Sequence, residues 1–169
     1  GRGSLKVRAR CKIEDLARGQ WQLVVTELPP GCSAQKVLEE IEELTNPKVK
    51  AGRKALSQEQ LQLKAAVLAV LDAVRDESNK DAKVRLVFEP KSRTVEQADL
   101  IHTLLAHTSL ESSTPVNLTM VGRDGRPTQK SLRQMLAEWL DFRQATLQRR
   151  TQHRLRKVLD RIHVLEGRQ

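Results

Sequence analysis

The end of the chain most strongly limits what this sequence can fold into. From Thr128 nothing interrupts a helical pattern until Gly167, and apolar residues recur mostly three, four or seven positions apart, which is a near-heptad repeat. The repeat consists of Leu132, Leu136, Leu140, Leu147, Thr151, Leu155, Val158, Ile162 and Leu165. The rest of the chain is too small to cover a helix of this length. We therefore expect the distal part of the helix to pack against another helix. It also lacks a clear stop signal, which indicates a piece of something larger.

Four segments before this helix have the alternation or the β-branched composition of strands. They are the residues up to about 12, then 21–28, 83–89 and 115–121. A short polar loop separates the first two, which therefore predict a hairpin. Pro90 closes the third segment, and Asp124-Gly125 marks a turn after the fourth.

Three shorter helices are predicted from their N-terminal capping residues. Ser33 precedes apolar residues at helical spacing, and two further positions match capping boxes. These are Ser57 with Gln60, and Thr94 with Gln97. The helix after Ser57 is expected to continue toward Val74.

The resulting order is strand, strand, helix, helix, strand, helix, strand, long helix. This order predicts an α+β fold, with a mainly antiparallel sheet of about four strands covered by helices on one face. The long C-terminal helix should protrude from it.

The first predicted strand carries a cation at every second position. Lys6, Arg8, Arg10 and Lys12 alternate with Leu5, Val7, Ala9 and Cys11, so the two sets point to opposite faces. Lysine and arginine often protect an edge strand against aggregation. The chain also carries a net charge of +9, which favours a polyanionic partner. If strands one and three share an open face, Lys83 and Arg85 would extend the cationic surface.

Two further observations bear on the kind of polyanion. The only aromatic residues are Trp21, Trp139, Phe88 and Phe142, and the polar strand faces offer none for base stacking, which favours duplex backbone over single strands. Arg123, Arg126 and Lys130 surround the start of the long helix, where phosphates bind well. A solvated turn explains the same residues.

The sequence offers little for catalysis, metal binding or membrane insertion. The acidic residues in 75–78 are expected to make local ion pairs and turn contacts, and the four histidines do not form a ligand set. The longest apolar run, 65–74, is too short to cross a bilayer. No signal-peptide pattern opens the chain. We therefore expect a cytoplasmic protein without a membrane anchor.

Read in order, eight short motifs resemble the breakage-reunion (A) subunits of bacterial type IIA DNA topoisomerases. They are GRGS at Gly1, RARC at Arg8, TELP at Thr26, VRDES at Val74, RLVFEP at Arg85, VGRDGRP at Val121, EWLDFR at Glu138 and RIHVLEG at Arg161. They span nearly the whole chain. DGRP followed by EWLDFR is more similar to the topoisomerase IV branch than to the gyrase branch.

The resemblance implies a division of the chain and a role for each part. Residues 1–127 would form the tower (shoulder) domain, with an insertion near 46–74, and residues 128–169 the long helix leading to the coiled coil. In that family the A subunits form a homodimer that binds double-stranded DNA, cleaves both strands through one tyrosine from each protomer and passes a second duplex through the break. Mg²⁺ and ATP act through the B subunits in an A2B2 assembly, on the chromosome in the bacterial cytoplasm.

Within this framework the chain itself is expected to be catalytically inert. It contains no tyrosine, so it cannot form the tyrosyl-phosphate link, and we expect in it no catalytic residue, metal site or cofactor.

From the placement of charge we expect contacts to the DNA backbone from one set of cations. They are first Lys6, Arg8 and Arg10, and then Arg2, Arg123 and Arg126. The alternatives are a structural scaffold that spaces the cleavage gate from the exit gate without touching DNA, or the equivalent fragment of the A subunit of gyrase.

Overall fold

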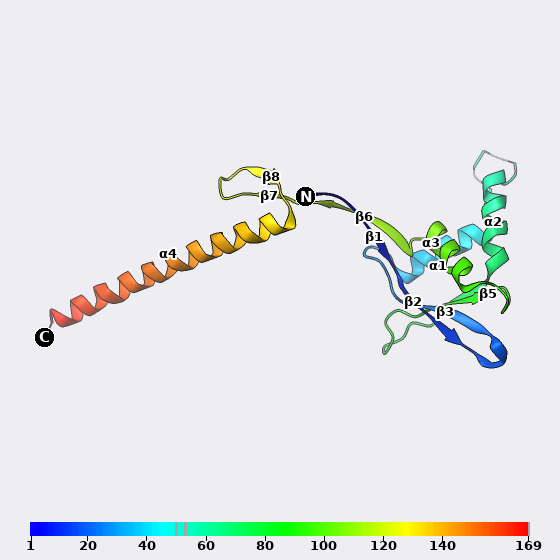
Figure 1. Cartoon of the computed structure of the whole chain (residues 1–169), viewed down its shortest axis with the longest axis horizontal. Helices are drawn as coiled ribbons and strands as arrows, with labels where there is room; N and C mark the ends of the chain where they lie inside the picture. The colour runs from blue at the N-terminus through cyan, green and yellow to red at the C-terminus, as the bar shows by residue number, and fades with distance from the viewer. Residues whose placement is uncertain (50, 53, 169) are drawn as a thin grey trace. The chain divides into compact units, whose positions relative to one another are not determined.

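The computed structural model describes residues 1–49, 51–52 and 54–168 and has the predicted α+β architecture. The chain forms two compact units, shown in Figure 1. We call Leu5–Thr114 the α/β unit, and Gly1–Ser4 with Pro115–Gln169 the helical unit. Strands β1 (Arg2–Arg8) and β6 (Glu111–Asn117) pair as a two-stranded sheet, and each strand contributes residues to both units. The expected division into residues 1–127 and 128–169 stays a prediction.

A four-stranded antiparallel sheet is the centre of the α/β unit. Its order is β2 (Arg10–Asp15), β3 (Trp21–Glu27), β5 (Leu86–Pro90) and β4 (Leu71–Asp76). The predicted hairpin is confirmed, because β2 pairs with β3, with Ile13 opposite Leu23. Leu23 in turn lies opposite Phe88 of β5. Apolar side chains of adjacent strands therefore lie on one face of the sheet.

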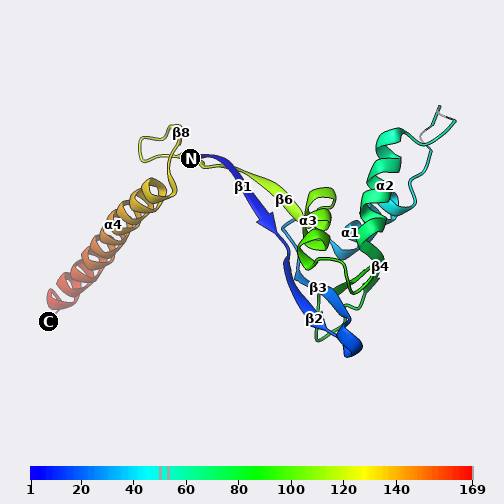
Figure 2. The same cartoon turned by 45° about the vertical axis from the view of Figure 1, so that its right-hand side comes forward.

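Helices α1 (Ala34–Thr45), α2 (Gln58–Val70) and α3 (Gln97–His107) complete the α/β unit. Figures 1 and 2 show α1 and α3 on one side of the sheet. Their apolar faces join those of the strands in one core, because Val37 and Leu100 pack into the same cluster as Phe88. Burial of these side chains is the main stabilising contribution to the unit.

Two of the three predicted caps are confirmed. The Ser33 hydroxyl accepts from the Lys36 amide at 3.2 Å, and Ser57 and Gln60 form a reciprocal capping box at the start of α2. The box predicted at Thr94 is wrong. Helix α3 begins at Gln97 after Glu96, without a side-chain cap, so Thr94 lies too early, and its hydroxyl instead contacts that of Ser92 at 2.7 Å.

The first predicted strand proves to be two strands in different sheets. The chain changes partner at Ala9, whose amide donates to the Leu110 carbonyl at 2.7 Å between β1 and β2. The alternating apolar side chains are therefore not buried together in one core. Leu5 and Cys11 are exposed, and only Val7 and Ala9 are half-buried.

The predicted helix from Ser57 also ends early. Helix α2 stops at Val70, and the chain continues as edge strand β4. The apolar run there fits the period of a helix as well as that of a strand, and pairing with β5 makes residues 71–76 a strand. Conversely, residues 115–121 lie in β6 and in β7 (Thr119–Val121), outside the four-stranded sheet.

The helical unit contains a hairpin and one long helix. Strand β7 pairs with β8 (Pro127–Gln129) across a turn in which Gly125 has φ of 75°, as the Asp124-Gly125 pair predicts. The long helix α4 (Leu132–Glu166) begins at a capping box of Ser131 and Gln134. It therefore starts later than predicted, because Thr128 belongs to β8.

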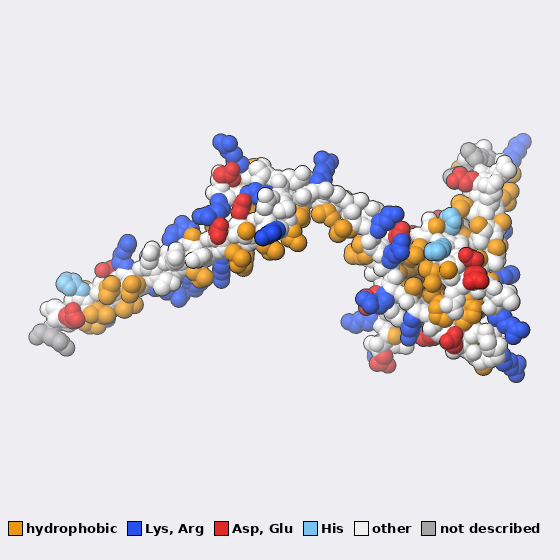
Figure 3. Space-filling view, viewed as in Figure 1, with side chains coloured by type: hydrophobic (Ala, Val, Ile, Leu, Met, Phe, Trp, Pro, Cys, Tyr) orange, Lys and Arg blue, Asp and Glu red, His pale blue; other side chains and the backbone are white. Residues whose placement is uncertain are grey.

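None of the described side chains of α4 is buried. Figure 3 shows its hydrophobic side chains at the surface, with Lys and Arg among them. Members of the near-heptad repeat such as Leu140 and Leu155 are 60% and 55% exposed. The packing of the repeat against another helix stays a prediction.

Candidate nucleic-acid interface

Three of the predicted DNA-contacting cations lie where β1 gives way to β2, in the α/β unit. Lys6 and Arg8 lie on β1, and Arg10 is the first residue of β2. Their side chains are 74%, 65% and 74% exposed. Lys6 and Arg8 lie two residues apart on β1 and therefore point to the same face of that strand, which suits a partner with repeated negative charge.

Carboxylates accompany all three of these cations. Glu111 of β6 pairs with both Lys6, at 3.9 Å, and the Nε of Arg8. Arg10 pairs with Glu27 at the end of β3, at 3.2 Å. Three cations and two carboxylates leave a local charge of +1, so this surface is less cationic than the sequence alone suggests.

The pairing still leaves Arg8 able to bind phosphate. Its Nε donates to Glu111, whereas the two terminal nitrogens have no hydrogen-bond acceptor among the described residues. A guanidinium carries five N–H donors in a planar fork, and its terminal pair matches two oxygens of a phosphate. Glu111 and a phosphate can therefore be held by Arg8 at the same time.

The other three predicted cations lie in the helical unit. Arg123 pairs with Asp141 of α4 at 3.9 Å. Arg126 follows the hairpin turn, and its backbone amide donates to Asp124 at 3.1 Å. Within the described part of the chain, the side chains of Arg2 and Arg126 have no carboxylate within 4.0 Å. These three residues belong to the helical unit, whereas Lys6 and Arg8 lie together in the α/β unit, where both pair with Glu111.

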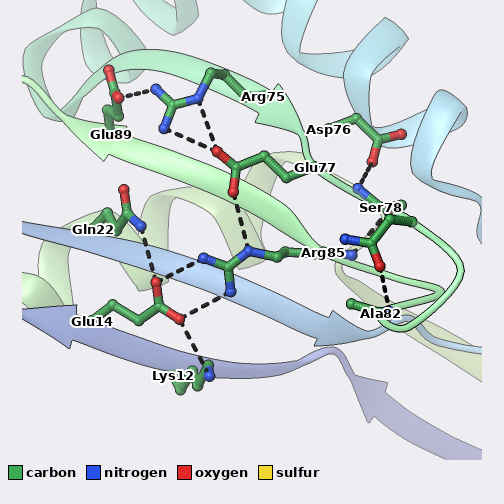
Figure 4. A network of polar contacts seen from close by, with 11 residues as sticks. Lys12, Glu14, Gln22, Arg75, Asp76, Glu77, Ser78, Ala82, Arg85 and Glu89 are labelled. Carbon is green, nitrogen blue, oxygen red and sulfur yellow. Dashed lines mark hydrogen bonds and ion pairs between the residues drawn. The ribbon is translucent and has the colours of Figure 1, made fainter.

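The expected extension of the cationic surface to Arg85 is wrong. Arg85 donates from its two terminal nitrogens to the two oxygens of Glu14, each at 2.9 Å, and from Nε to Glu77 at 3.1 Å (Figure 4). Its charge is therefore paired with these two carboxylates, and the hydrogen bonds to Glu14 and Glu77 raise the pKa of its guanidinium. The Arg85 hydrogen bonds, helped by one from Gln22, lower the pKa of Glu14 from 4.5 to about 2.

This ion network covers the face of the sheet opposite the helices. It runs from Lys12 through Glu14, Arg85 and Glu77 to Arg75, as Figure 4 shows. Val24 and Val87 lie on the same face of neighbouring strands, and both are fully buried. Within this network the three cations Lys12, Arg75 and Arg85 pair with the three carboxylates of Glu14, Glu77 and Glu89, so the network has no net charge.

The acidic segment at 75–78 makes the local contacts that the sequence predicts. Arg75 pairs with Glu89 and, at 3.4 Å, with Glu77, while Asp76 accepts from the Ser78 amide at 2.9 Å. Over the described ranges, no three of the His, Cys, Asp and Glu side chains gather closely enough to hold a metal ion.

The described part of the chain also contains no helix with the length and apolar content needed to span a bilayer.

Sequence analysis missed the carboxylates that neutralise the cations. Glu111 lies 103 residues from Arg8 in the sequence, and no local pattern links them. It also missed the conformation at the tip of the β2–β3 hairpin, where Arg18 has φ of 61°. Gly19 has φ of 71°, and the Arg18-Gly19 pair marks the turn without showing that the arginine adopts the left-handed conformation as well as the glycine.

Comparisons with known proteins cover the whole chain. Residues 1–169 match the family model that describes the A subunit of DNA gyrase/topoisomerase IV. The chain is 55% identical over 168 residues to the A subunit of DNA topoisomerase 4 from Neisseria gonorrhoeae, with 99% of this chain and 22% of that protein covered. It is 40% identical over 167 residues to the protein of the same name from Escherichia coli K12, with 99% and 19% covered. The chain thus spans about a fifth of the length of these relatives.

Proposed function

The chain belongs to the family of DNA gyrase and topoisomerase IV A subunits, and we propose that it is the tower part of a topoisomerase IV A subunit that contacts the backbone of the gate duplex. One observation carries the proposal. Lys6, Arg8 and Arg10 are spaced along extended backbone and are each about two-thirds exposed or more. Such cations bind phosphates without reading sequence, as an enzyme that holds many different duplexes requires.

In the intact enzyme this region would serve ATP-dependent breakage, passage and rejoining of double-stranded DNA. The partners proposed are double-stranded DNA, a second A subunit, and the B subunits in an A2B2 assembly, in the bacterial cytoplasm. The chain has no tyrosine, so its own residues do not supply the tyrosine nucleophile. The described residues also form no cluster of His, Cys, Asp or Glu side chains that could hold Mg²⁺.

Backbone contacts far from the cleavage site have a physical purpose. Bending a duplex of 20–30 base pairs costs on the order of several kcal/mol. Contacts to the arms of the bent duplex offset that cost, and each phosphate neutralised also releases counterions. Arg2, Arg123 and Arg126 are proposed as further backbone contacts from the helical unit, on the same grounds of charge and exposure.

One observation favours a second candidate function. The carboxylates of Glu111 and Glu27 already accompany all three cations of the α/β unit, as expected if these residues only keep a strand edge soluble. The chain would then be a scaffold that spaces the cleavage gate from the exit gate. The equivalent fragment of the gyrase A subunit is a further alternative, which the relatives named topoisomerase 4 make weaker.

Duplex binding across a salt series tests the proposal. Fluorescence anisotropy with a labelled duplex of about 30 base pairs should give a logarithmic salt slope near −0.9 per neutralised phosphate. Lys6, Arg8 and Arg10 changed together to Glu should flatten the slope and weaken binding.

A matched variant separates this site from overall charge. Lys36, Lys54 and Lys80 are exposed cations of the α/β unit and have no carboxylate within 4.0 Å among the described residues. Their change to Glu alters the net charge equally. If both triple variants weaken binding to the same extent, or the unaltered chain does not bind at low salt, the scaffold replaces the proposal.

A further inference from the structure

One concave surface of the α/β unit is not lined by the cations Lys6, Arg8 and Arg10. It is a groove of about 960 Å³ between the C-terminal half of α1 and α2, and it also reaches β4 and the end of α3. Its floor includes the half-buried side chains of Leu38, Leu44, Leu63 and Val74. A groove of this volume with an apolar floor is large enough for a segment of a ligand to bury several side chains.

The rim of this groove is acidic. Glu39, Glu42 and Glu43 of α1 line it, and none has a Lys, Arg or His partner within 4.0 Å among the residues that the structure describes. By contrast, Glu14, Glu77 and Glu111 each pair with two cations. Lys48 and His107 also line the groove, but its four glutamates outnumber them. In a chain with a net charge of +9, the groove is thus a local region of net negative charge.

The walls of the groove are fixed by hydrogen bonds that do not use the rim charges. Glu40 accepts from the backbone amide of Ser109 at 2.6 Å and from its hydroxyl, which ties α1 to the segment after α3. The capping box of Ser57 and Gln60 fixes the start of α2, and the Gln60 amide donates to the Lys48 carbonyl at 3.3 Å. A groove with fixed walls binds at a lower entropic cost.

We propose that this groove is a docking site for a basic, amphipathic peptide segment of a partner protein. The segment would place apolar side chains on the floor, around Leu38 and Leu63, and Lys or Arg side chains against the rim carboxylates. Opposed potentials favour such a partner and reject a nucleic acid, whose phosphates Glu39, Glu42 and Glu43 repel. The inference therefore goes beyond the proposed DNA contacts and does not depend on them.

A peptide of the required chemistry provides the first test. The sequence of residues 146–165 contains Arg149, Arg150, Arg154, Arg156, Lys157 and Arg161, with leucines and valines between them. We would label this peptide and measure its binding to the whole chain by anisotropy at about 50 mM salt. A 1:1 complex is expected, and the same peptide with its leucines changed to serine should bind more weakly.

Two double variants locate the site. Glu39→Gln with Glu43→Gln should raise the dissociation constant at least about fivefold, since each exposed charge contact contributes modestly. Glu59→Gln with Glu96→Gln removes the same charge from exposed positions outside the groove and should leave binding unchanged. Circular dichroism checks that both variants keep the helical content of the unaltered chain.

Three outcomes would overturn the proposal. They are no binding of the peptide, an equal loss in both double variants, and self-association of the chain that Glu39→Gln with Glu43→Gln abolishes. The last outcome would make a second copy the occupant. A Leu63→Gln variant provides an independent test. It alters the apolar floor of the groove without changing charge, and it should also weaken binding of the peptide.

Discussion

Arg85 and Glu14 form a two-pronged ion pair across the exposed face of the sheet, with Nη1 to Oε1 and Nη2 to Oε2 both at 2.9 Å. The pair joins the residue just before β5 to β2, and β3 lies between these two strands in the sheet. It also lies on the face where Val24 and Val87 are buried. Long charged side chains commonly bury their aliphatic stems along apolar surface while their charged heads pair, which agrees with the burial of these two valines beneath an ion network.

Glu14 should make stability depend on pH in the acid range. Its pKa is about 2 in the folded protein against an ordinary 4.5, so its contribution is complete above pH 4.5 and is lost as pH falls through about 2. Glu14→Gln should cost about 1 to 2 kcal/mol at pH 7. Denaturant unfolding at several pH values measures this difference. A difference that stays constant down to pH 2 would contradict the prediction, and Glu59→Gln serves as the control.

The caps of α2 and α3 should respond differently to the same kind of change. Ser57→Ala removes a hydroxyl that accepts from the Gln60 amide, and this should cost about 1 kcal/mol. Thr94→Ala should cost much less, because its hydroxyl contacts only that of Ser92 among the described residues. Thermal unfolding of the two variants compares them directly. Equal losses would show that Thr94 caps α3 after all.

Glu111 should reduce the affinity of the chain for DNA, if Lys6 and Arg8 bind phosphates as proposed. Its carboxylate already neutralises part of their charge. Glu111→Gln keeps an acceptor for Arg8 but removes that charge, so duplex affinity should rise a few-fold at low salt and less at high salt. Anisotropy with the duplex used above measures it. A fall in affinity would instead make Glu111 a residue that positions Arg8.

The two phenylalanines should differ greatly in their effect on stability. Phe88 is fully buried in the core, whereas Phe142 of α4 is 54% exposed. Phe88→Ala should cost about 3 to 5 kcal/mol, and Phe142→Ala should change the unfolding free energy of the chain by less than about 0.5 kcal/mol. Chemical denaturation at low protein concentration tests both. A large loss for Phe142→Ala would indicate that α4 is packed in solution.

Local signals in the sequence predicted where helices begin better than they predicted which segments pair with each other. Ser33 and the Ser57–Gln60 box fixed two helix starts, because a cap depends only on nearby residues. The end of α2 at Val70 could not be predicted, since pairing with β5 decides it. The division of the first strand at Ala9 likewise depends on Leu110, which is distant in the sequence.

The candidate site shows the same limit. Alternation correctly predicted that Lys6, Arg8 and Arg10 are exposed, because charged side chains stay in water. It could not predict that Glu111 and Glu27 accompany them, or that Arg85 is committed to Glu14. Each of these pairs depends on strand order and register, which no local pattern in the sequence determines.

Helix α4 has a thermodynamic consequence that follows from its exposed surface. At about 1.5 Å per residue, its 35 residues extend about 52 Å, yet no described side chain along it is buried. Its hydrogen bonds therefore lack the packing that makes most protein helices persist. In the chain alone, α4 should fray gradually on warming, before the sheet unfolds cooperatively. If a second helix packed on the apolar repeat, α4 and the sheet would unfold together in one cooperative transition. Association with that helix would therefore complete the folding of α4.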